Sequence, residues 1–196
     1  MSIQKWNDRY RAGEQVFRDP APLVEKFAGN LAPGVALDLA CGPGRNALFL
    51  AARGWEVTAV DGSPIAIDLL RERARSENLS SEARIADLER AEFEIAPASY
   101  DLICSCYYFQ RDLIPALKNG VKPGGLAIVI VHLMDSGEIQ PNPYRARAGE
   151  LREYFSDWTV LHDYEGQPHE SCHAHQVAEL VARKPDLSGR SNTRSD

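Results

Sequence analysis

The feature that most constrains the fold is the stretch from position 35 to position 61, which reads VALDLACGPGRNALFLAARGWEVTAVD. It opens with an apolar run at residues 35–40, which predicts a buried strand because the run is too short for most helices. A glycine-rich turn at residues 41–44 leads into a helix predicted over residues 46–53, with its apolar side chains on one stripe. A second strand at residues 56–60 ends on an acid. This order of elements predicts a parallel α/β sheet.

The turn and the acid indicate a ligand that carries a ribose. Gly42 and Gly44 have no Cβ atom, so backbone amides can approach a ligand closely, and the following helix points its positive end at the same place. Asp61 ends the neighbouring strand, where its two oxygens can accept both ribose hydroxyls. The spacing from Gly42 to Ala47 also fits a dinucleotide fingerprint. The pattern alone leaves NAD, another adenosine ligand and a tight turn without a ligand open.

The composition disfavours several classes of protein. A chain of 196 residues is long enough for one ordinary domain, and a net charge of −6 disfavours binding to a nucleic-acid backbone. No apolar run reaches membrane-spanning length, the first residues lack the apolar segment of a signal peptide, and the four cysteines show no CxxC spacing. We therefore expect a cytoplasmic monomer with free thiols, and neither a nucleic acid nor a membrane as partner.

Three further parallel strands are predicted at residues 83–88, 100–107 and 126–133, from their apolar and β-branched runs. A helix is expected over residues 64–78, because Ser63-Pro64 is a helix start with a capping residue and a proline at the first helical position. A further helix is expected over residues 111–118. The sheet thus continues the alternation of strand and helix that begins at the glycine turn.

The last third of the chain follows a different pattern. Strands predicted at residues 158–164 and 176–183 have only a hairpin between them, so they are antiparallel. The interpretation is one domain, residues 1–184, with five parallel strands and a C-terminal antiparallel hairpin. Residues 1–30 form a helical segment that either acts as a lid over a ligand crevice or only covers the sheet. Residues 185–196 have no apolar periodicity and are expected to be disordered.

Five short motifs run along the chain in a fixed order. They are residues 37–44 (LDLACGPG), Asp61, Ala86-Asp87-Leu88, Tyr100-Asp101-Leu102 and Lys122-Pro123-Gly124-Gly125. In this order and spacing they resemble the class I S-adenosylmethionine (SAM)-dependent methyltransferases. The resemblance implies an α/β, Rossmann-like seven-stranded sheet in the order 3-2-1-4-5-7-6, with helices on both faces and SAM as cofactor across the ends of strands 1 to 4.

Within that class the chain is similar to the small bacterial tellurite-resistance-type methyltransferases. The similarity lies in residues 6–10 (WNDRY), 44–47 (GRNA), 53–55 (RGW) and 57–64 (VTAVDGSP). One segment departs from the pattern. Such relatives often carry a histidine-containing turn after the fourth strand, whereas residues 107–110 of this chain read YYFQ. This segment lies near the transferred methyl group, so the departure leaves the acceptor open.

The resemblance implies a role for residues at both ends of the cofactor. The residues expected to contact SAM are Arg9, Tyr10, Asp38, Ala40, Gly42, Gly44, Arg45, Asp61, Gly62, Ala86, Asp87, Leu88, Ser105 and Cys106. Asp61 is expected to bind the ribose and Asp87 the adenine amino group, while Arg9, Tyr10 and Arg45 are candidates for the methionyl carboxylate. The residues expected to contact the acceptor are Tyr107, Tyr108, Tyr144 and Arg145.

The expected reaction is a direct SN2 methyl transfer from SAM to a small-molecule acceptor. The acceptor is expected to be a thiol, a selenol or a metalloid oxyanion, because a thiolate, a selenolate or an oxyanion is already nucleophilic near neutral pH and needs no protein base, whereas an alcohol or an ammonium group does. The candidates for such a base are Tyr107 and His132, although His132 also fits an ordinary histidine at the rim of the core. A SAM-binding sensor without catalysis and an NAD-linked oxidoreductase stay open as alternatives.

A polar cluster in the last hairpin raises the question of a metal. It consists of His169, Cys172, His173 and His175, whose residue types are common metal ligands. No residues elsewhere in the sequence evidently complete a set of metal ligands with this cluster. We interpret the cluster as a polar hairpin on an edge strand and expect no metal, with metal binding by the cluster left open.

Overall fold

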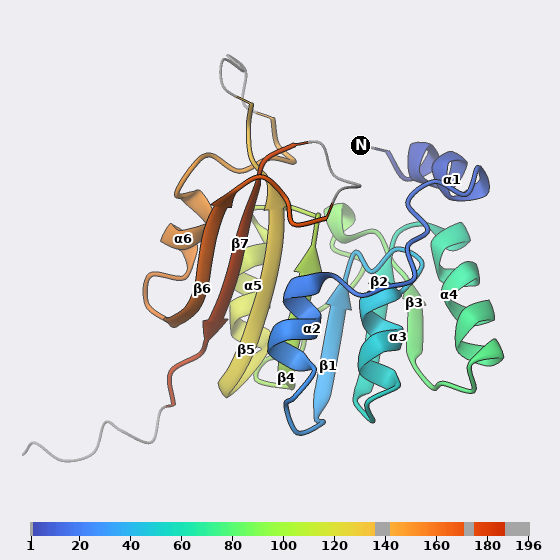
Figure 1. The fold of residues 1–196 in the computed structure, drawn as a ribbon, viewed down its shortest axis with the longest axis horizontal. Helices are drawn as coiled ribbons and strands as arrows, with labels where there is room; N and C mark the ends of the chain where they lie inside the picture. The colour runs from blue at the N-terminus through green and yellow to red at the C-terminus, as the bar shows by residue number, and fades with distance from the viewer. Residues whose placement is uncertain (1, 136–141, 171–174, 187–196) are drawn as a thin grey trace, which may run out of the picture.

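The computed structural model describes residues 2–135, 142–170 and 175–186. Seven strands form one sheet in the order β3-β2-β1-β4-β5-β7-β6 (Figure 1). The strands are β1 (Val35–Leu39), β2 (Glu56–Asp61), β3 (Glu82–Ile85), β4 (Tyr100–Cys106), β5 (Val121–His132), β6 (Thr159–Gly166) and β7 (Val177–Arg183). Strands β1 to β5 pair in parallel, and β7 pairs antiparallel with both β5 and β6. The predicted α/β, Rossmann-like fold and its strand order are confirmed.

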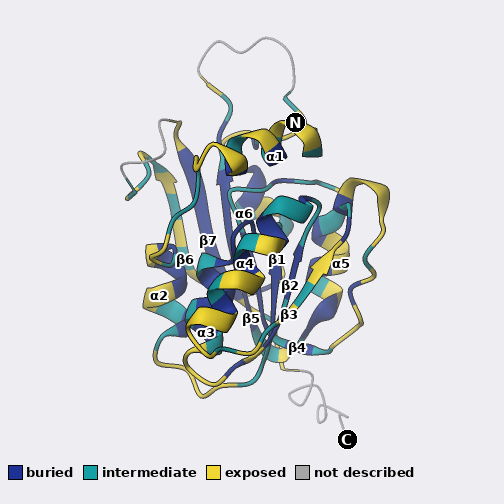
Figure 2. Ribbon diagram, turned by 90° about the vertical axis from the view of Figure 1, so that its right-hand side faces the viewer, coloured by how far each residue is buried: buried dark blue, intermediate teal, exposed yellow. Residues whose placement is uncertain are grey.

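Helices cover both faces of this sheet, as predicted. They are α1 (Ile3–Arg11), α2 (Pro22–Ala28), α3 (Arg45–Ala51), α4 (Pro64–Ser76), α5 (Leu113–Gly120) and α6 (Glu150–Tyr154). Apolar side chains of α2, α3 and α4 join one core layer, and those of α5 and α6 join the layer on the opposite face. Figure 2 shows buried strands in the middle of the molecule and exposed outer faces on α3 and α4.

The burial of each strand follows from its place in the sheet. Central strands have helices on both faces, so nearly every residue of β1, β4 and β7 is buried. The edge strand β6 instead alternates between exposed and half-buried residues, and the other edge strand, β3, is largely exposed. This difference explains why the apolar runs of the central strands predicted their positions well.

Several boundaries differ from the sequence prediction, and three of them lie around the strands that position the site. Strand β3 ends at Ile85 and not at residue 88, because Asp87 caps a single 3-10 turn and its Oδ1 accepts the Glu89 N–H at 3.0 Å. The turn predicted at residues 123–125 lies inside β5, where the pairing with β4 is irregular. Gly125 allows this close approach, since a Cβ there would lie 2.9 Å from a backbone oxygen of β4. Helix α5 begins at Leu113, two residues later than predicted.

The N-terminal segment divides into two parts with different positions. Helix α1 lies beyond the carboxyl ends of β2 and β3, next to α4 (Figure 1). A buried hydrogen bond from Ser63 Oγ to Asn7 Oδ1, 2.5 Å long, ties α1 to the N-terminus of α4. Helix α2 instead packs its apolar side chains into the core beside α3. Helix α2 thus fits the interpretation that residues 1–30 only cover the sheet. The other interpretation, a lid over the strand ends, stays a prediction for α1.

Two further expectations concern the C-terminal tail and the membrane. The predicted disordered tail, residues 185–196, lies outside the described residues from position 187 onward. Within the described ranges, no helix combines the length and the apolar character needed to cross a lipid bilayer.

Candidate functional site

A cleft of about 690 Å³ lies at the carboxyl ends of the central strands and extends under α1. Open parallel sheets bind their ligands at this edge, where the strand order changes direction between β1 and β4. The predicted site residues that line the cleft are Tyr10, Ala40, Gly42, Arg45, Asp61, Gly62, Asp87, Leu88, Cys106, Tyr107 and Tyr108. Residues that sequence reasoning did not single out also contribute, among them Trp6 and Phe17 from the N-terminal segment.

The glycine turn after β1 forms the floor of the cleft. Gly42 and Gly44 both adopt positive φ angles, 53° and 81°. A Cβ atom on Gly44 would lie 2.5 Å from the side chain of Leu70, and a Cβ on Gly42 would lie 3.0 Å from the Tyr10 hydroxyl. Any larger residue at either position would therefore strain the backbone and crowd a neighbour. The turn thus brings its backbone amides close to the cleft.

Asp61 lies at the end of β2 and holds the turn in place. Its Oδ2 accepts the Gly42 N–H and its Oδ1 accepts the Ser63 N–H, both at 2.8 Å. Burial raises the pKa of the Asp61 carboxyl, and the two amide hydrogen bonds oppose that rise. Each oxygen has a further lone pair and the residue lines the cleft, so the carboxylate can still accept two adjacent hydroxyl groups.

Asp38 lies beneath the turn and outside the cleft lining. Its side chain is 1% exposed, and its Oδ2 accepts the Ala47 N–H at 3.1 Å. This bond satisfies one of the free amides in the first turn of α3. Burial raises the pKa of Asp38 to about 7, with the Ala47 amide and Arg45 opposing the rise. Asp38 therefore supports the N-terminus of α3 directly behind the glycine turn.

Asp87 and Leu88 form the wall of the cleft after β3. Asp87 lines the cleft while it caps the 3-10 turn, and Gln110 Nε2 donates to the Leu88 carbonyl at 3.2 Å. Ala86 is buried and its N–H donates to the Asp61 carbonyl. Ala86 therefore supports the wall from behind and does not belong to the lining residues.

At the end of β4 a buried ion pair closes the cleft. Arg45 binds Glu170 in a bidentate manner, with N–O distances of 2.5 and 3.0 Å, and the Tyr107 hydroxyl donates to Glu170 Oε2 at 2.5 Å. The Arg45 guanidinium also lies 5.2 Å from the ring centroid of Phe17 and 5.5 Å from that of Tyr107. Sequence reasoning missed Glu170, because an acid in a polar hairpin carries no local signal for a contact 125 residues away.

Four neutral side chains lie at or near the end of β4. Asn46, Cys106, Tyr107 and Tyr108 all line the cleft. Burial raises the pKa of Cys106, Tyr107 and Tyr108 well above their usual ranges. The thiol and both phenols are therefore protonated near neutral pH, and they act there as hydrogen-bond donors and apolar surface. Tyr107 also adopts a positive φ of 64°, a strained conformation of the kind that concentrates at functional sites.

Several predicted site residues lie outside the lining of the cleft. Arg9 pairs with Glu14 at 3.1 Å and lies 5.0 Å from the ring centroid of Trp6. Ser105 is buried and donates to the Tyr108 carbonyl at 3.3 Å. Gly44 also lies outside the lining, as the residue that starts α3. These positions support the cleft from behind or beside it.

His132, the candidate base, also lies outside the cleft lining, at the end of β5. Its ring packs against the ring of Tyr107, 5.4 Å between centroids, and against that of His175 at 5.8 Å. Tyr107 therefore lies directly beside it, as one of the residues that form the wall of the cleft. The role of His132 as a base stays a prediction.

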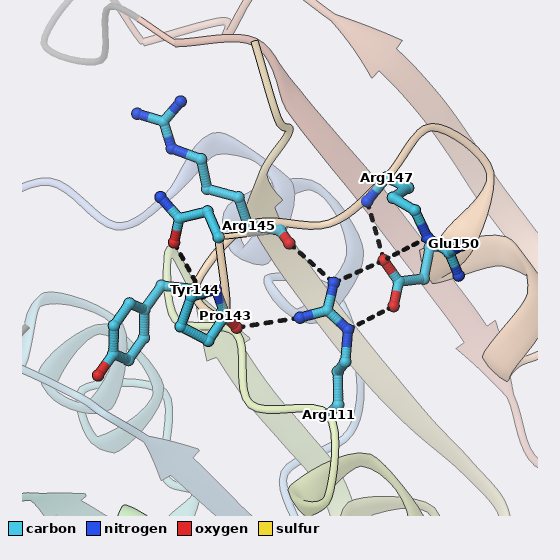
Figure 3. A network of polar contacts seen from close by, with 7 residues as sticks. Arg111, Pro143, Tyr144, Arg145, Arg147 and Glu150 are labelled. Atoms are coloured by element: carbon cyan, nitrogen blue, oxygen red, sulfur yellow. Dashed lines mark hydrogen bonds and ion pairs between the residues drawn. The ribbon is translucent and has the colours of Figure 1, made fainter. Parts of the chain in front are cut away.

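The predicted acceptor residues Tyr144 and Arg145 lie in a loop beside the cleft (Figure 3). Arg111 organises this loop, because its guanidinium donates to the carbonyls of Pro143 and Arg145 and forms two hydrogen bonds with Glu150. Tyr144 is 41% exposed and lines a shallower hollow of about 300 Å³. The side chain of Arg145 extends away from Arg111 in Figure 3 and pairs with Asp135 at 2.5 Å.

The histidine cluster of the last hairpin is only partly described. Cys172 and His173 lie outside the described residues. His169 Nδ1 lies 3.2 Å from a Glu179 oxygen, and His175 Nδ1 lies 3.5 Å from Asp135. Among the side chains that the structure places, no group of three or more His, Cys, Asp or Glu residues could hold a metal ion.

Comparison with known proteins identifies the family. A family model described as tellurite resistance protein TehB matches residues 18–177. Hemagglutinin 1 of Eikenella corrodens is 33% identical over 148 residues, which cover 70% of this chain and 48% of that protein. The probable S-adenosyl-L-methionine-dependent methyltransferase TehB of Haemophilus influenzae is 30% identical over 140 residues, which cover 67% of this chain and 48% of that protein. The chain spans about half the length of these curated relatives.

A solved structure of a TehB protein also matches this chain. The crystal structure of TehB from Haemophilus influenzae matches with a TM-score of 0.72 and 26% identity, over 91% of this chain and 67% of that chain. The predicted resemblance to the tellurite-resistance-type methyltransferases is confirmed. The match over residues 18–177 and the likeness to TehB in sequence and structure show that the chain belongs to the TehB family.

Proposed function

We propose that this protein is a SAM-dependent methyltransferase that acts on a small-molecule acceptor. Membership of the TehB family supports the proposal, as does the name of the Haemophilus influenzae relative, a probable SAM-dependent methyltransferase. The cleft supports it independently, because its lining combines a glycine turn, Asp61 and Asp87 at the ends of three neighbouring strands.

The residues present fit SAM at each part of the molecule. At Gly42 the close Tyr10 hydroxyl leaves no space for a side chain, so the backbone itself faces the cleft. Asp61 would accept the ribose hydroxyls, and Asp87 would accept from the adenine amino group. Tyr10 and Arg45 would lie toward the methionyl end, with Arg45 held by Glu170. When bound, SAM supplies a methyl group on a sulfonium, which a nucleophile attacks directly.

The chain itself would bind SAM, orient it and exclude water from the reaction. Such a reaction depends mainly on alignment and a dry approach. Asp38 and Asp61 fix the turn through hydrogen bonds to the Ala47, Gly42 and Ser63 amides. The aromatic rings of Trp6, Phe17, Tyr107 and Tyr108 cover the cleft with apolar surface.

We base the proposed class of acceptor on the protonation of the side chains at the end of β4. The carrying observation is that burial raises the pKa of Cys106, Tyr107 and Tyr108, so the side chains at the end of β4 stay protonated. A protein base is thus absent among these three lining residues. An acceptor that is already nucleophilic near neutral pH suits this wall, namely a thiol, a selenol or a metalloid oxyanion.

The test is a screen of acceptors with SAM, reading the release of S-adenosylhomocysteine. The panel contains small thiols, selenite, tellurite and small amines, with reactions lacking an acceptor as the blank. Turnover is expected with at least one thiol or oxyanion and not with the amines. Turnover with amines alone would contradict the proposed acceptor class. SAM binding without any turnover would favour a sensor, and binding of NAD in place of SAM would favour an oxidoreductase.

A further inference from the structure

The ion pair between Arg45 and Glu170 joins two distant parts of the chain at one end of the cleft. Arg45 begins α3, whereas Glu170 lies in the connection between β6 and β7. Because β7 runs antiparallel to β5 and His132 pairs with Val177, the start of β7 lies at the same edge of the sheet as the cleft. The two side chains are only 11% and 14% exposed. A charge pair shielded from water in this way acts strongly on its surroundings.

The balance of charge at this end depends on Glu170. Cys106 and Tyr107, which line the cleft beside Arg45, are neutral, whereas Glu170 is the carboxylate hydrogen-bonded to Arg45. The bidentate contact with Glu170 cancels the positive charge of Arg45. With a neutral side chain at position 170, the wall would present an uncompensated guanidinium to the cleft.

This charge matters because the cofactor and its product differ by one charge at that place. The sulfonium of SAM is positive, and loss of the methyl group leaves the neutral thioether of S-adenosylhomocysteine. An uncompensated guanidinium nearby would repel the sulfonium of SAM, whereas its attraction for the methionyl carboxylate would act on both ligands alike. A carboxylate that neutralises the guanidinium removes this repulsion, which acts on the cofactor and not on its product.

We propose that Glu170 is a positioning residue that neutralises Arg45 and thereby lets the cleft bind SAM in preference to S-adenosylhomocysteine. The inference rests on the proposed function and adds a determinant of the preference for cofactor over product. Glu170 acts through Arg45, and its hydrogen bond from Tyr107 fixes the same carboxylate in place.

The experiment is calorimetric titration of SAM and of S-adenosylhomocysteine into the wild type and Glu170→Gln. The ratio of the Kd for SAM to the Kd for S-adenosylhomocysteine is expected to rise about tenfold in the variant, because only SAM carries the sulfonium charge. Added salt should reduce the difference. Glu25→Gln, an exposed position on α2, is the matched control and should change neither constant.

Two more variants separate charge from structure. Tyr107→Phe removes a hydrogen bond to Glu170 and keeps both charges, so the ratio of the two constants should stay at the wild-type value. The double variant Arg45→Gln with Glu170→Gln removes both charges and should restore that ratio, even if both affinities fall. Equal weakening of both ligands in Glu170→Gln would overturn the inference and leave the proposed function intact. A wild type that binds neither ligand would overturn both.

Discussion

The two sides of the cleft are built from different kinds of contact. At the ends of β1 and β2, the supporting hydrogen bonds join residues close in sequence: Asp61 to amides 2 and 19 residues away, and Asp38 to an amide 9 residues away. At the ends of β4 and β5, the supporting contacts are long-range. Arg45 and Glu170 are 125 residues apart, and Arg111 and Glu150 are 39 residues apart.

This difference has a physical consequence for how each side responds to change. Short-range contacts form within one strand–turn–helix unit, so they depend on the backbone of that unit. Long-range contacts join surface loops across the sheet, so a loop can change without disturbing the strands beneath it. Substitutions in the strand–turn–helix unit should therefore disturb its own backbone, whereas substitutions in the loops of the other side should leave the glycine turn in place.

The largest expected effect is on the fold and comes from the glycine turn. Gly44→Ala should lower the free energy of unfolding by about 3 kcal/mol, from the strained positive φ and the collision with buried Leu70. Gly149→Ala is the matched control, because Gly149 also precedes a helix with a positive φ but has open space around its Cβ position. It should lose only about 1 kcal/mol. Urea unfolding measures both, and equal losses would contradict the collision.

The next effect tests the acceptor side. Arg111→Ala should lower the free energy of unfolding by about 2 kcal/mol, because it removes the guanidinium that forms two hydrogen bonds with the Glu150 carboxylate, which is 6% exposed. The carboxylate keeps its longer contact with the Arg147 guanidinium, at 3.7 Å. Arg111 itself is 35% exposed, which reduces the loss below that of a fully buried pair. The Kd for SAM should stay within about twofold of the wild-type value. A tenfold weaker Kd would show that the two sides are coupled, and Arg71→Ala, in an exposed pair, is the control.

A smaller effect follows from Asp38 and depends on pH. Burial raises the pKa of Asp38 to about 7 in the folded protein, so between its ordinary value and pH 7 the folded state holds a proton that the unfolded chain releases. Stability therefore falls as the pH rises through this window, by about 1 kcal/mol from pH 6 to pH 7. Asp38→Asn keeps an oxygen for the Ala47 amide and should flatten this slope. Unfolding at pH 5, 6 and 7 measures it, and parallel slopes in both proteins would refute the assignment.

The smallest effect separates two roles of Tyr107. Tyr107→Phe removes one hydrogen bond to Glu170 and should lower kcat about threefold. A protonated phenol with a raised pKa cannot act as a base at neutral pH. A loss of more than a hundredfold, measured by release of S-adenosylhomocysteine, would instead support Tyr107 as a catalytic base.

The sequence predicted the elements whose causes are local. The apolar runs and glycine turns predicted the strands, whereas their order came from the family resemblance. Ser63 marks the start of α4, where its Oγ accepts the Ala66 N–H. Gly42, Asp61 and Asp87 were expected at the cleft, and all three line it. In each case the contact lies within a short segment, so the spacing of residues carries the geometry.

Other features depend on contacts that no short segment contains. Glu170 reaches Arg45 only because the last hairpin returns to the cleft edge, and nothing near Glu170 in the sequence marks that contact. Arg9 was expected near the methionyl carboxylate, but the rotation of α1 directs it toward Trp6 and Glu14. The end of β3 was placed too late, because the capping preference of Asp87 outweighs the apolar pattern around it.

The central claim is that the short-range side of the cleft binds SAM through Asp61. Calorimetric titration of SAM and NAD into the wild type and Asp61→Ala tests it, with Asp68→Ala on the exposed face of α4 as the control. The wild type and the control should bind SAM and not NAD. Asp61→Ala should bind SAM at least about tenfold more weakly, from the loss of charge-assisted hydrogen bonds. An unchanged Kd in Asp61→Ala, or no binding of SAM to the wild type, would contradict the claim.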